Sequence, residues 1–260
     1  MVFRIVIWER KLGGGSSLLL EVQNLSKRFG GLQAVNDLVF AAEEREILGL
    51  IGPNGAGKTT VFNLITGVYA PDSGAIRFQG KNIAGLKPYQ TCINGICRTF
   101  QIAQPFREMT ALKNVMTGAF LRTADVEEAK RKAEEVLDFV ALGGKKDILA
   151  KELTAIDQRR LEVARALATD PRLLLLDETM AGLNSKECDE AVSLINKIRD
   201  KGITLIMVEH VVRVIMSLSK RIIVLDYGTK IAEGKAEDIR SNENVIKAYL
   251  GEEYRRAIGQ

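Results

Sequence analysis

The early part of the chain reads as a series of short strands. Apolar or alternating segments of this kind lie at 18–23, 35–42 and 75–79, with a dense turn signal at 69–74. Between the first two segments, residues 26–31 read as a turn with Phe29 at its edge. Residues 88–96 have a helical pattern, and 98–101 read as a strand. These spacings predict a mainly antiparallel β subdomain near the start of the chain.

The pattern becomes helical from 111 to 168 and then returns to strands. Asp125 and Glu128 form a capping-box start, followed by a helix whose other face is charged and solvated. The apolar stripe of this helix contains Ala129, Ala133, Val136, Leu137 and Val140. Strands at 173–176, 203–208 and 221–225 then alternate with helices at 186–199 and 211–219. Such alternation predicts a parallel sheet, so we expect an α/β core interrupted by a helical insertion.

Composition places the chain among ordinary globular proteins. Its 260 residues are 46% hydrophobic and 27% charged, which allows one large domain or two small ones. The net charge of +4 is mild; it permits a basic patch for nucleic acid or anionic lipid, but a solvated surface of mixed sign is the favoured interpretation. We expect no nucleic-acid partner. No apolar run approaches the ~20 residues of a membrane-spanning helix, so any membrane role must come through a partner.

The cysteines and the first residues add little chemistry. Cys92, Cys97 and Cys188 are too few and too scattered for a disulfide framework or a zinc site, and we expect reduced packing residues. Residues 1–17 end in Gly-Gly-Gly-Ser-Ser, which is typical of a flexible leader, and they fail the pattern of a signal peptide.

Residues 52–60 read GPNGAGKTT and fit the phosphate-loop pattern G-x-x-x-x-G-K-[ST]. A glycine-rich turn with an incidental lysine is the bland alternative, but an apolar strand precedes this loop and a helical pattern follows it. Glycine lets backbone N–H groups approach a polyphosphate, Lys58 would contact the β- and γ-phosphates, and the Thr59 hydroxyl would bind Mg²⁺. The nucleotide-binding positions expected from this loop are Gly52, Pro53, Asn54, Gly55, Gly57, Lys58, Thr59 and Thr60.

Two further strands end in candidate catalytic residues. The apolar run 173–176 leads into Asp177 and Glu178, so we expect Asp177 to reach Mg²⁺ through water and Glu178 to act as the base. Acidic residues at strand ends are common, and the signal becomes specific only beside the phosphate loop. His210 follows another apolar strand. A lone histidine is usually structural, but at the same sheet edge it could contact the γ-phosphate.

With these residues in place, the chain from Leu18 onward resembles the ATP-binding subunits of ABC transporters. Residues 52–60 resemble the Walker A loop, 173–178 the Walker B strand and 181–184 the D-loop. Gln101 matches the Q-loop residue, His210 the switch histidine, and Phe29 the aromatic residue that stacks on adenine, although a half-buried sheet aromatic is the bland alternative. Val35 is also expected to contact the nucleotide. The segments 98–101, 105–110, 158–162 and 248–251 are most similar to importers of branched-chain amino acids.

The resemblance implies a fold, roles and partners. The fold would be a P-loop ABC ATPase over 18–250, with a core at 18–100 and 170–250, a helical subdomain at about 101–169, and a tail at 251–260. Lys58 would hold phosphate, Thr59 and Gln101 would bind Mg²⁺, Glu178 would be the base, and His210 would contact the γ-phosphate. Two such subunits, identical or different, would sandwich two ATP molecules. A membrane permease would dock near Gln101 and the helical subdomain, which places the subunit at the inner face of the membrane.

One motif departs from the family pattern Leu-Ser-Gly-Gly-Gln. The corresponding residues are Leu153, Thr154, Ala155, Ile156 and Asp157. Ile156 would crowd the phosphate of the partner subunit's nucleotide, and a carboxylate at 157, about 6 Å from a phosphate, would cost on the order of 1–3 kcal/mol. Thr154 and Asp157 also make a capping box for a helix reaching Leu167, so the same change helps a helix to begin. Thr179 replaces a proline, which we expect to be a minor backbone change.

We therefore expect an ATPase that drives import, in an asymmetric heterodimer or a weakly active homodimer. A soluble ABC-type ATPase acting on nucleic acid or ribosomes is a second candidate, but such chains usually carry a coiled-coil insertion or a second cassette. A regulatory module that binds ATP and barely hydrolyses it is a third candidate. The altered motif at 153–157 favours that module, whereas Glu178 and His210 argue against it.

Overall fold

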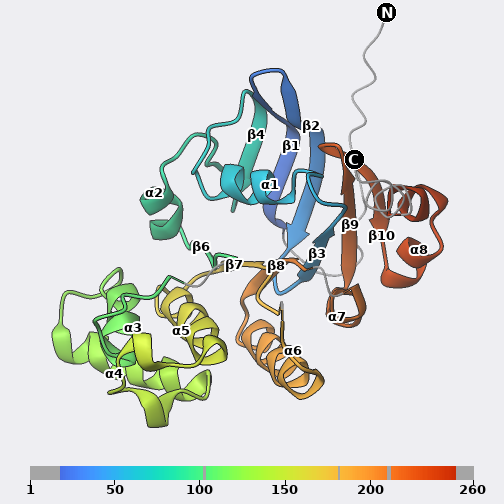
Figure 1. Cartoon of the computed structure of the whole chain (residues 1–260). Coiled ribbons are helices and arrows are strands. Elements are labelled where there is room, and N and C mark those ends of the chain that lie inside the picture. The colour runs from blue at the N-terminus through green and yellow to red at the C-terminus, as the bar shows by residue number, and fades with distance from the viewer. Residues whose placement is uncertain (1–17, 102–103, 181, 210–211, 250–260) are drawn as a thin grey trace, which may run out of the picture.

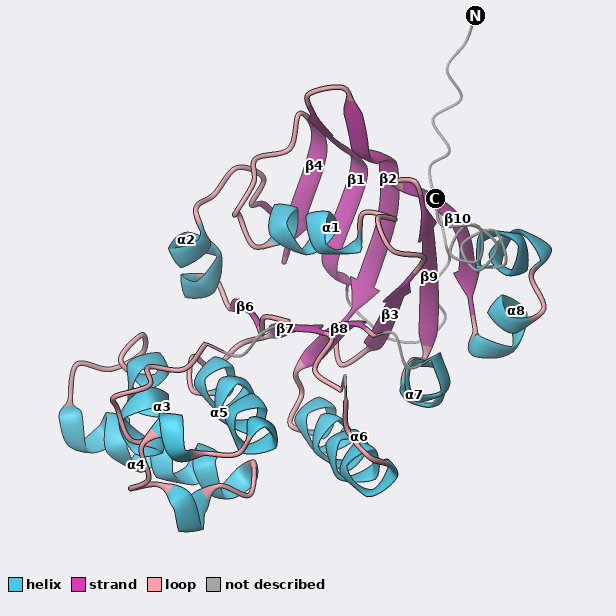
Figure 2. Cartoon of the chain, viewed as in Figure 1, coloured by secondary structure: helices cyan, strands magenta, loops and turns pink. Residues whose placement is uncertain are grey.

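The structure is a computed structural model that describes residues 18–249 except 102–103, 181 and 210–211 (Figure 1). The leader, the tail, Ala181 of the expected D-loop and His210 therefore lie outside the described residues. Among the described residues, two sheets and a group of helices make up the fold (Figure 2).

The smaller sheet is antiparallel, as the early strand patterns predict. Its order is β2-β1-β4-β5, formed by β1 (Leu18–Phe29), β2 (Leu32–Glu43), β4 (Ser73–Phe78) and β5 (Lys81–Asn82). The prediction of a turn from residue 26 is wrong, because β1 continues to Phe29 and pairs it with Leu32. The turn is confined to Gly30 and Gly31, where the positive φ of Gly30 reverses the chain.

The larger sheet has the order β10-β9-β3-β8-β7-β6. Its strands are β3 (Ile47–Ile51), β6 (Ile96–Arg98), β7 (Leu173–Asp177), β8 (Thr204–Val208), β9 (Arg221–Asp226) and β10 (Thr229–Gly234). All neighbours from β9 to β6 pair in parallel, and β10 is antiparallel to β9. Every residue of β3, β7 and β8 is buried, which explains why these segments are apolar runs rather than alternating patterns.

Helices cover both faces of the larger sheet. Helix α1 (Lys58–Ile65) follows the phosphate loop, and α2 (Pro88–Ile93) lies near the end of α1 and β6 (Figure 1). Helices α3 (Ala111–Ala119), α4 (Val126–Phe139) and α5 (Ala155–Leu167) form a separate group. The remaining helices are α6 (Ser185–Asp200), α7 (Val212–Leu218) and α8 (Ala236–Arg240), with single 3-10 turns at Gly143–Lys145 and Ala150–Glu152. The helix expected at 88–96 ends at Ile93, because Gly95 has φ 99° and the chain then extends as β6. That strand spans Ile96–Arg98 and not 98–101.

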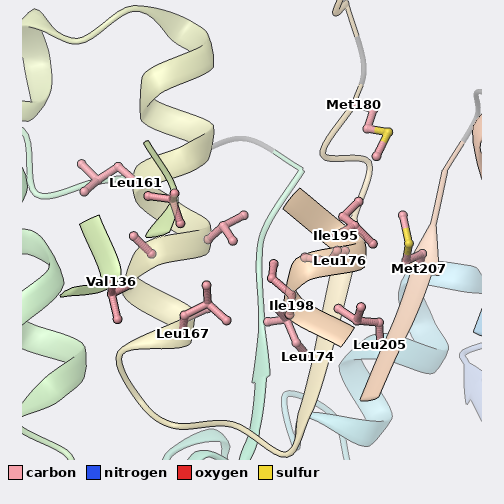
Figure 3. Packing of buried hydrophobic residues seen from close by; sticks show 14 of the residues in the cluster. Val136, Leu161, Leu167, Leu174, Leu176, Met180, Ile195, Ile198, Leu205 and Met207 are labelled. Atoms are coloured by element: carbon pink, nitrogen blue, oxygen red, sulfur yellow. The ribbon is translucent and has the colours of Figure 1, made fainter. Parts of the chain in front are cut away.

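Two hydrophobic cores lie on the two faces of the larger sheet. Successive strand residues alternate between them, so that Leu174 and Leu176 face one core while Leu173 and Leu175 face the other. One core joins the smaller sheet and α1 to the larger sheet. The other joins the larger sheet to α6 and to the helices α3 to α5 (Figure 3). The predicted stripe of α4 is buried in this second core, which confirms the fold class with its helical insertion.

Candidate functional site

The phosphate loop lies between β3 and α1, in the strand–loop–helix order that the sequence predicts. The Lys58 side chain is buried, and its Nζ donates hydrogen bonds to the carbonyls of Gly52 at 2.7 Å and Pro53 at 2.8 Å. Gly57 caps α1 with φ 100°, and a Cβ there would lie 2.4 Å from the Ala34 carbonyl oxygen. The close approach of β2 therefore requires glycine at this position.

The outer side of this loop is open to solvent. Asn54, Gly55 and Thr59 are exposed, whereas Pro53 and Ala56 are buried beneath them. The Gly228 N–H, in the turn between β9 and β10, donates to the Ala56 carbonyl at 3.0 Å and holds the buried side of the loop. The loop is thus held by its neighbours on one side and accessible on the other.

The two carboxylates predicted from the sequence lie at the end of β7. Asp177 is 3% exposed and forms an ion pair with Arg98 at 2.9 Å. Burial raises the pKa of Asp177, while the positive charges of Arg98 and Lys58 act against this rise. Glu178 follows with φ 49°, and its N–H donates to the Val208 carbonyl at 2.8 Å. A non-glycine residue held at positive φ stores strain, which is typical of functional sites.

The structure also brings the expected Q-loop residue to the carboxylates. The Gln101 amide Nε2 donates to Glu178 Oε2 at 2.6 Å, although the two residues are 77 positions apart. Lys58, Asp177, Glu178 and Gln101 therefore belong to one site, with Asp177 under the electrostatic influence of both Lys58 and Glu178. His210 lies outside the described residues, so its contact with the γ-phosphate stays a prediction.

The sequence reasoning missed two charged residues at this sheet edge. Arg98, the partner of Asp177, received no role of its own, although a charged residue at the end of a short buried strand is a usable signal. Glu209 is 4% exposed and accepts hydrogen bonds from the Met180 N–H at 3.0 Å and the Thr179 hydroxyl at 3.2 Å. Burial raises the pKa of Glu209 to about 7. Thr179 thus supplies a hydroxyl that proline could not, so the replacement is more than a minor backbone change.

The residues expected to contact the adenine behave differently from each other. Phe29 is 40% exposed and packs edge-on against Tyr69, with ring centroids 5.0 Å apart. Lys27 Nζ also lies over this ring, 5.6 Å from its centroid, so a base would stack on the exposed part of Phe29 that Tyr69 and Lys27 leave uncovered. Val35 is fully buried in the core beneath the smaller sheet, so its side chain offers no surface to a nucleotide. The Val35 side chain thus has a packing role, and the expected contact of Val35 with the nucleotide stays a prediction.

Only half of the capping box expected at residues 154–157 is present, because the Asp157 carboxylate bonds to side chains and not to the Thr154 backbone N–H. Thr154 caps α5 by accepting the Asp157 N–H at 3.2 Å. Asp157 is 5% exposed and bonds to Lys145 Nζ at 2.6 Å and to the Thr154 hydroxyl at 2.8 Å. Burial raises the pKa of Asp157, but the bonds from Lys145 and Thr154 outweigh it and lower the pKa overall. Because Lys145 compensates the charge, the expected repulsion of a partner's phosphate by Asp157 is corrected to a paired, structural carboxylate.

Ile156 is half-buried on α5. It lines a cavity of about 410 Å³ between α5 and α6, together with Val163, Thr179 and Leu194. Asn184 begins α6 by accepting the Glu187 N–H at 3.0 Å, so the described part of the expected D-loop ends in a capped helix. At position 156 the chain therefore carries a β-branched side chain where the family pattern has a glycine.

A second cavity, of about 440 Å³, lies beside the segment leading to Gln101. It is lined by Cys97, Arg98, Phe100, Thr117, Glu162 and Arg165, and we call it the Phe100 cavity. The Glu162 carboxylate accepts the Phe100 N–H at 2.7 Å, and burial raises the pKa of Glu162 to about 7. Arg165 packs over the exposed ring of Phe106 at 4.6 Å, and its buried Nε has no hydrogen-bond partner among the described residues. The cavity therefore combines aromatic surface with an unsatisfied donor.

The described residues contain neither a ready-made cluster of metal ligands nor a helix that could span a membrane. Within them, no group of three or more His, Cys, Asp or Glu side chains could by itself hold a metal ion. The residues expected at Mg²⁺ are instead a hydroxyl, an amide and one carboxylate, at Thr59, Gln101 and Asp177. No helix in the same ranges is long and apolar enough to cross a membrane.

Comparison with known families gives two matches. The profile of the ABC transporter family matches residues 35–181, and a profile described as branched-chain amino acid ATP-binding cassette transporter matches 229–255. The chain is 43% identical to the high-affinity branched-chain amino acid transport ATP-binding protein BraF of Pseudomonas aeruginosa, covering 90% of this chain and 98% of that one. It is 42% identical to the protein of the same description, LivG, of Escherichia coli K12, covering 91% and 99%.

Solved structures give a matching picture. An ATP-binding cassette of an ABC transporter in its ADP conformation aligns with a TM-score of 0.83 and 29% identity over 90% of this chain and 99% of that chain. A dimeric ATP-binding cassette in a post-hydrolysis state, bound to ADP and phosphate, aligns with a TM-score of 0.76 and 26% identity, covering 84% of this chain and 99% of that chain.

A sequence relative of different description also matches. The lipopolysaccharide export system ATP-binding protein LptB of Haemophilus influenzae is 32% identical, covering 91% of this chain and 99% of that one.

Proposed function

This chain belongs to the ABC transporter family, and we propose that it is the ATP-hydrolysing subunit of an importer of branched-chain amino acids. The observation that carries the proposal is the 43% identity to BraF over 98% of that protein. The family profile for branched-chain amino acid cassettes at 229–255 supports the same solute class in a separate part of the chain.

In this proposal the phosphate loop holds ATP. Lys58 turns its ammonium from the Gly52 and Pro53 carbonyls to the β- and γ-phosphates, which are stronger acceptors. The N–H groups at the start of α1, beside the exposed Thr59 and the half-buried Thr60, complete the anion site. Phe29 offers the exposed part of its ring to the adenine. Glu178 accepts a proton from the attacking water, and Gln101, which donates to Glu178, orients that carboxylate.

The residues present fit Mg²⁺ as the companion of ATP. Mg²⁺ prefers oxygen ligands and usually keeps several waters, so one or two protein oxygens and the phosphates complete its shell. Thr59 presents an exposed hydroxyl, Gln101 an amide oxygen, and Asp177 a buried carboxylate that can act through water. The metal would supply positive charge against the phosphate oxygens as the bond to the leaving group breaks.

The same family includes exporters, which makes lipopolysaccharide export a second candidate. The 32% identity to LptB favours it, but the identity to BraF and LivG is higher and the profile at 229–255 is specific to branched-chain amino acid cassettes. We therefore retain import as the proposed direction.

Two features support the expected partners: the open side of the phosphate loop and the Phe100 cavity. A second ATPase subunit would close over the open side of the phosphate loop, in the manner of the dimeric cassette that aligns with this chain. A membrane permease would dock at the Phe100 cavity, where the Phe100 ring is 53% exposed and the nearby Phe106 ring, which packs against Arg165, is 46% exposed. This arrangement places the subunit at the inner face of the membrane.

The altered motif predicts inequality between the two sites of that dimer. Because Lys145 compensates Asp157, the defect rests on Ile156, whose side chain replaces the glycine that approaches the partner's nucleotide. A partner subunit with a glycine-containing motif would leave this chain's own loop fully active. We therefore favour a heterodimer with one efficient site.

Reconstitution tests the proposal. The chain is purified with a candidate permease and a second ATPase subunit, placed in vesicles with ATP on the subunit side, and assayed for transport of labelled leucine, isoleucine and valine. ATP-dependent uptake that disappears in Glu178→Gln supports import. A complex that hydrolyses ATP without moving any of the three amino acids would contradict it, and release of lipid from the vesicles would favour the export candidate.

A further inference from the structure

The guanidinium of Arg98 joins the two elements that carry the magnesium-binding side chains. We propose that Arg98 is a positioning residue for ATP hydrolysis, which fixes Asp177 of β7 relative to α1 and so sets the geometry of the Mg²⁺ site. This inference rests on the proposed nucleotide site and deepens it. Arg98 itself touches neither ATP nor the metal in this proposal.

The contact with Asp177 is buried and directional. Arg98 Nη2 donates to Asp177 Oδ2 at 2.9 Å, and the two side chains are 9% and 4% exposed. The Asp177 N–H also donates to the Thr99 hydroxyl at 3.3 Å, so the residue after Arg98 holds the same strand end. A buried carboxylate with these partners has one preferred orientation, and its free oxygen is therefore aimed by Arg98.

The second arm of the guanidinium reaches α1. Arg98 Nη1 donates to Asn63 Oδ1 at 2.5 Å. Asn63 lies four residues after Thr59 in the same helix, so both side chains occupy one face of α1. Thr59 is expected to bind Mg²⁺ and Asp177 to reach the same ion through water. The planar guanidinium of Arg98 therefore links the helix of the first group to the strand of the second. A lysine has a single ammonium on a flexible stem and cannot bridge both partners in this fixed geometry.

The guanidinium of Arg98 also contacts the Phe100 cavity. Its guanidinium lies 4.7 Å from the centroid of the Phe100 ring, and Phe100 is 53% exposed and directly precedes Gln101. Glu162 holds the Phe100 N–H from the side of α5. A permease segment seated in the cavity would press on Phe100 and thus on Arg98, so the placement of Asp177 becomes sensitive to docking.

A simpler role for Arg98 would be to neutralise a buried carboxylate. In that case any cation at residue 98 would serve, and loss of the contact to Asn63 would have no effect on the metal. The positioning role predicts instead that lysine at residue 98 fails to replace arginine, and that loss of the contact to Asn63 weakens Mg²⁺ binding. Arg98→Lys keeps the charge and loses the fork, and Asn63→Ala keeps the ion pair and frees it from α1.

The test measures Mg²⁺ dependence in the full chain. Binding of a fluorescent ATP analogue is followed in EDTA and along a Mg²⁺ titration, and kcat and KM are measured at saturating Mg²⁺. The matched control is Arg221→Lys, because Arg221 bonds Glu46 at 3.1 Å, where Glu46 is 3% exposed and lies just before β3, at the sheet edge away from the phosphate loop. Partners that orient metal ligands typically change metal affinity or activity by about 10–100-fold when mutated.

We expect Arg98→Lys to raise the Mg²⁺ concentration for half-maximal binding and to lower kcat, each by about 10-fold or more, with KM and binding in EDTA nearly unchanged. Asn63→Ala should change the Mg²⁺ concentration for half-maximal binding and kcat in the same directions by smaller factors. Arg221→Lys should change neither quantity. The proposal is overturned if Arg98→Lys keeps the unmodified Mg²⁺ dependence and kcat, or if the Arg221 control shows the same loss. An unmodified chain that binds no Mg²⁺–ATP would instead overturn the proposed site.

Discussion

Two glycines of the phosphate loop provide a matched pair of substitutions. Gly57 and Gly55 both have positive φ, at 100° and 78°, so alanine is strained at either position. They differ in what a new Cβ would meet. At Gly57 it would lie 2.4 Å from the Ala34 carbonyl oxygen, whereas at Gly55 no atom lies within 4 Å. The difference between the two alanine variants therefore isolates the clash from the backbone strain.

The loss of stability in each variant follows from the cost of the left-handed backbone and, at Gly57 alone, the cost of the clash. Left-handed backbone costs an ordinary L-residue about 1–2 kcal/mol, and both variants bear this cost. Only Gly57→Ala must also move the backbone of β2, because the Ala34 oxygen cannot rotate away, and such overpacking costs a further ~1–3 kcal/mol. A loss of 1 kcal/mol lowers the Tm of a chain of this size by roughly 2–4 °C. We expect Gly57→Ala to lower the Tm about twice as far as Gly55→Ala.

Thermal unfolding followed by circular dichroism, with urea unfolding as a second measure, decides the outcome. Both variants are compared without nucleotide, because both positions belong to the proposed ATP site and a ligand would add its own contribution. Nucleotide binding is then measured separately, where Gly57→Ala should lose more affinity because it displaces the first residue of α1, Lys58. Equal losses of stability in the two variants would refute the packing of the phosphate loop against β2 as the reason for Gly57.

Three further predictions concern single side chains. Glu178→Gln should slow single-turnover hydrolysis by about 10²-fold or more while ATP still binds, and a rate close to the unmodified one would exclude Glu178 as the base. The folded pKa of Glu162, about 7, exceeds its unfolded value of 4.5, so its contribution to stability is full below pH 4.5 and is lost as the pH rises to 7. Glu162→Gln should therefore flatten the fall in unfolding free energy between pH 5 and 7.5 by up to about 1.4 kcal/mol per pH unit, and an unchanged slope would contradict a buried, protonated Glu162. Ile156→Gly should raise the hydrolysis rate of the homodimer, whereas Asp157→Gln should not, since its charge is already paired with Lys145; a homodimer indifferent to Ile156→Gly would remove the basis for unequal sites.

Much of the fold was predictable because it depends on local periodicity. The apolar runs of β3, β7 and β8 and the stripe of α4 each report burial within one segment, and the structure buries them as expected. The boundaries were less predictable. Strand β1 extends to Phe29 because of its pairing with β2, and a polar sequence such as Ser-Lys-Arg carries no sign of a partner strand.

The sequence alone determined the phosphate loop at 52–60 and the carboxylates at 177 and 178, because a loop that wraps phosphate and a strand that ends in acids are both contiguous in the chain. The tertiary structure decided which side chains face those groups. Arg98 meets Asp177 across 79 residues of sequence, and Lys145 meets Asp157 from a separate turn. Val35, in an alternating strand, could have faced either side until the pairing of the smaller sheet placed it in the core. Such contacts are set by strand order and register, which bring distant segments together only when the whole sheet has formed.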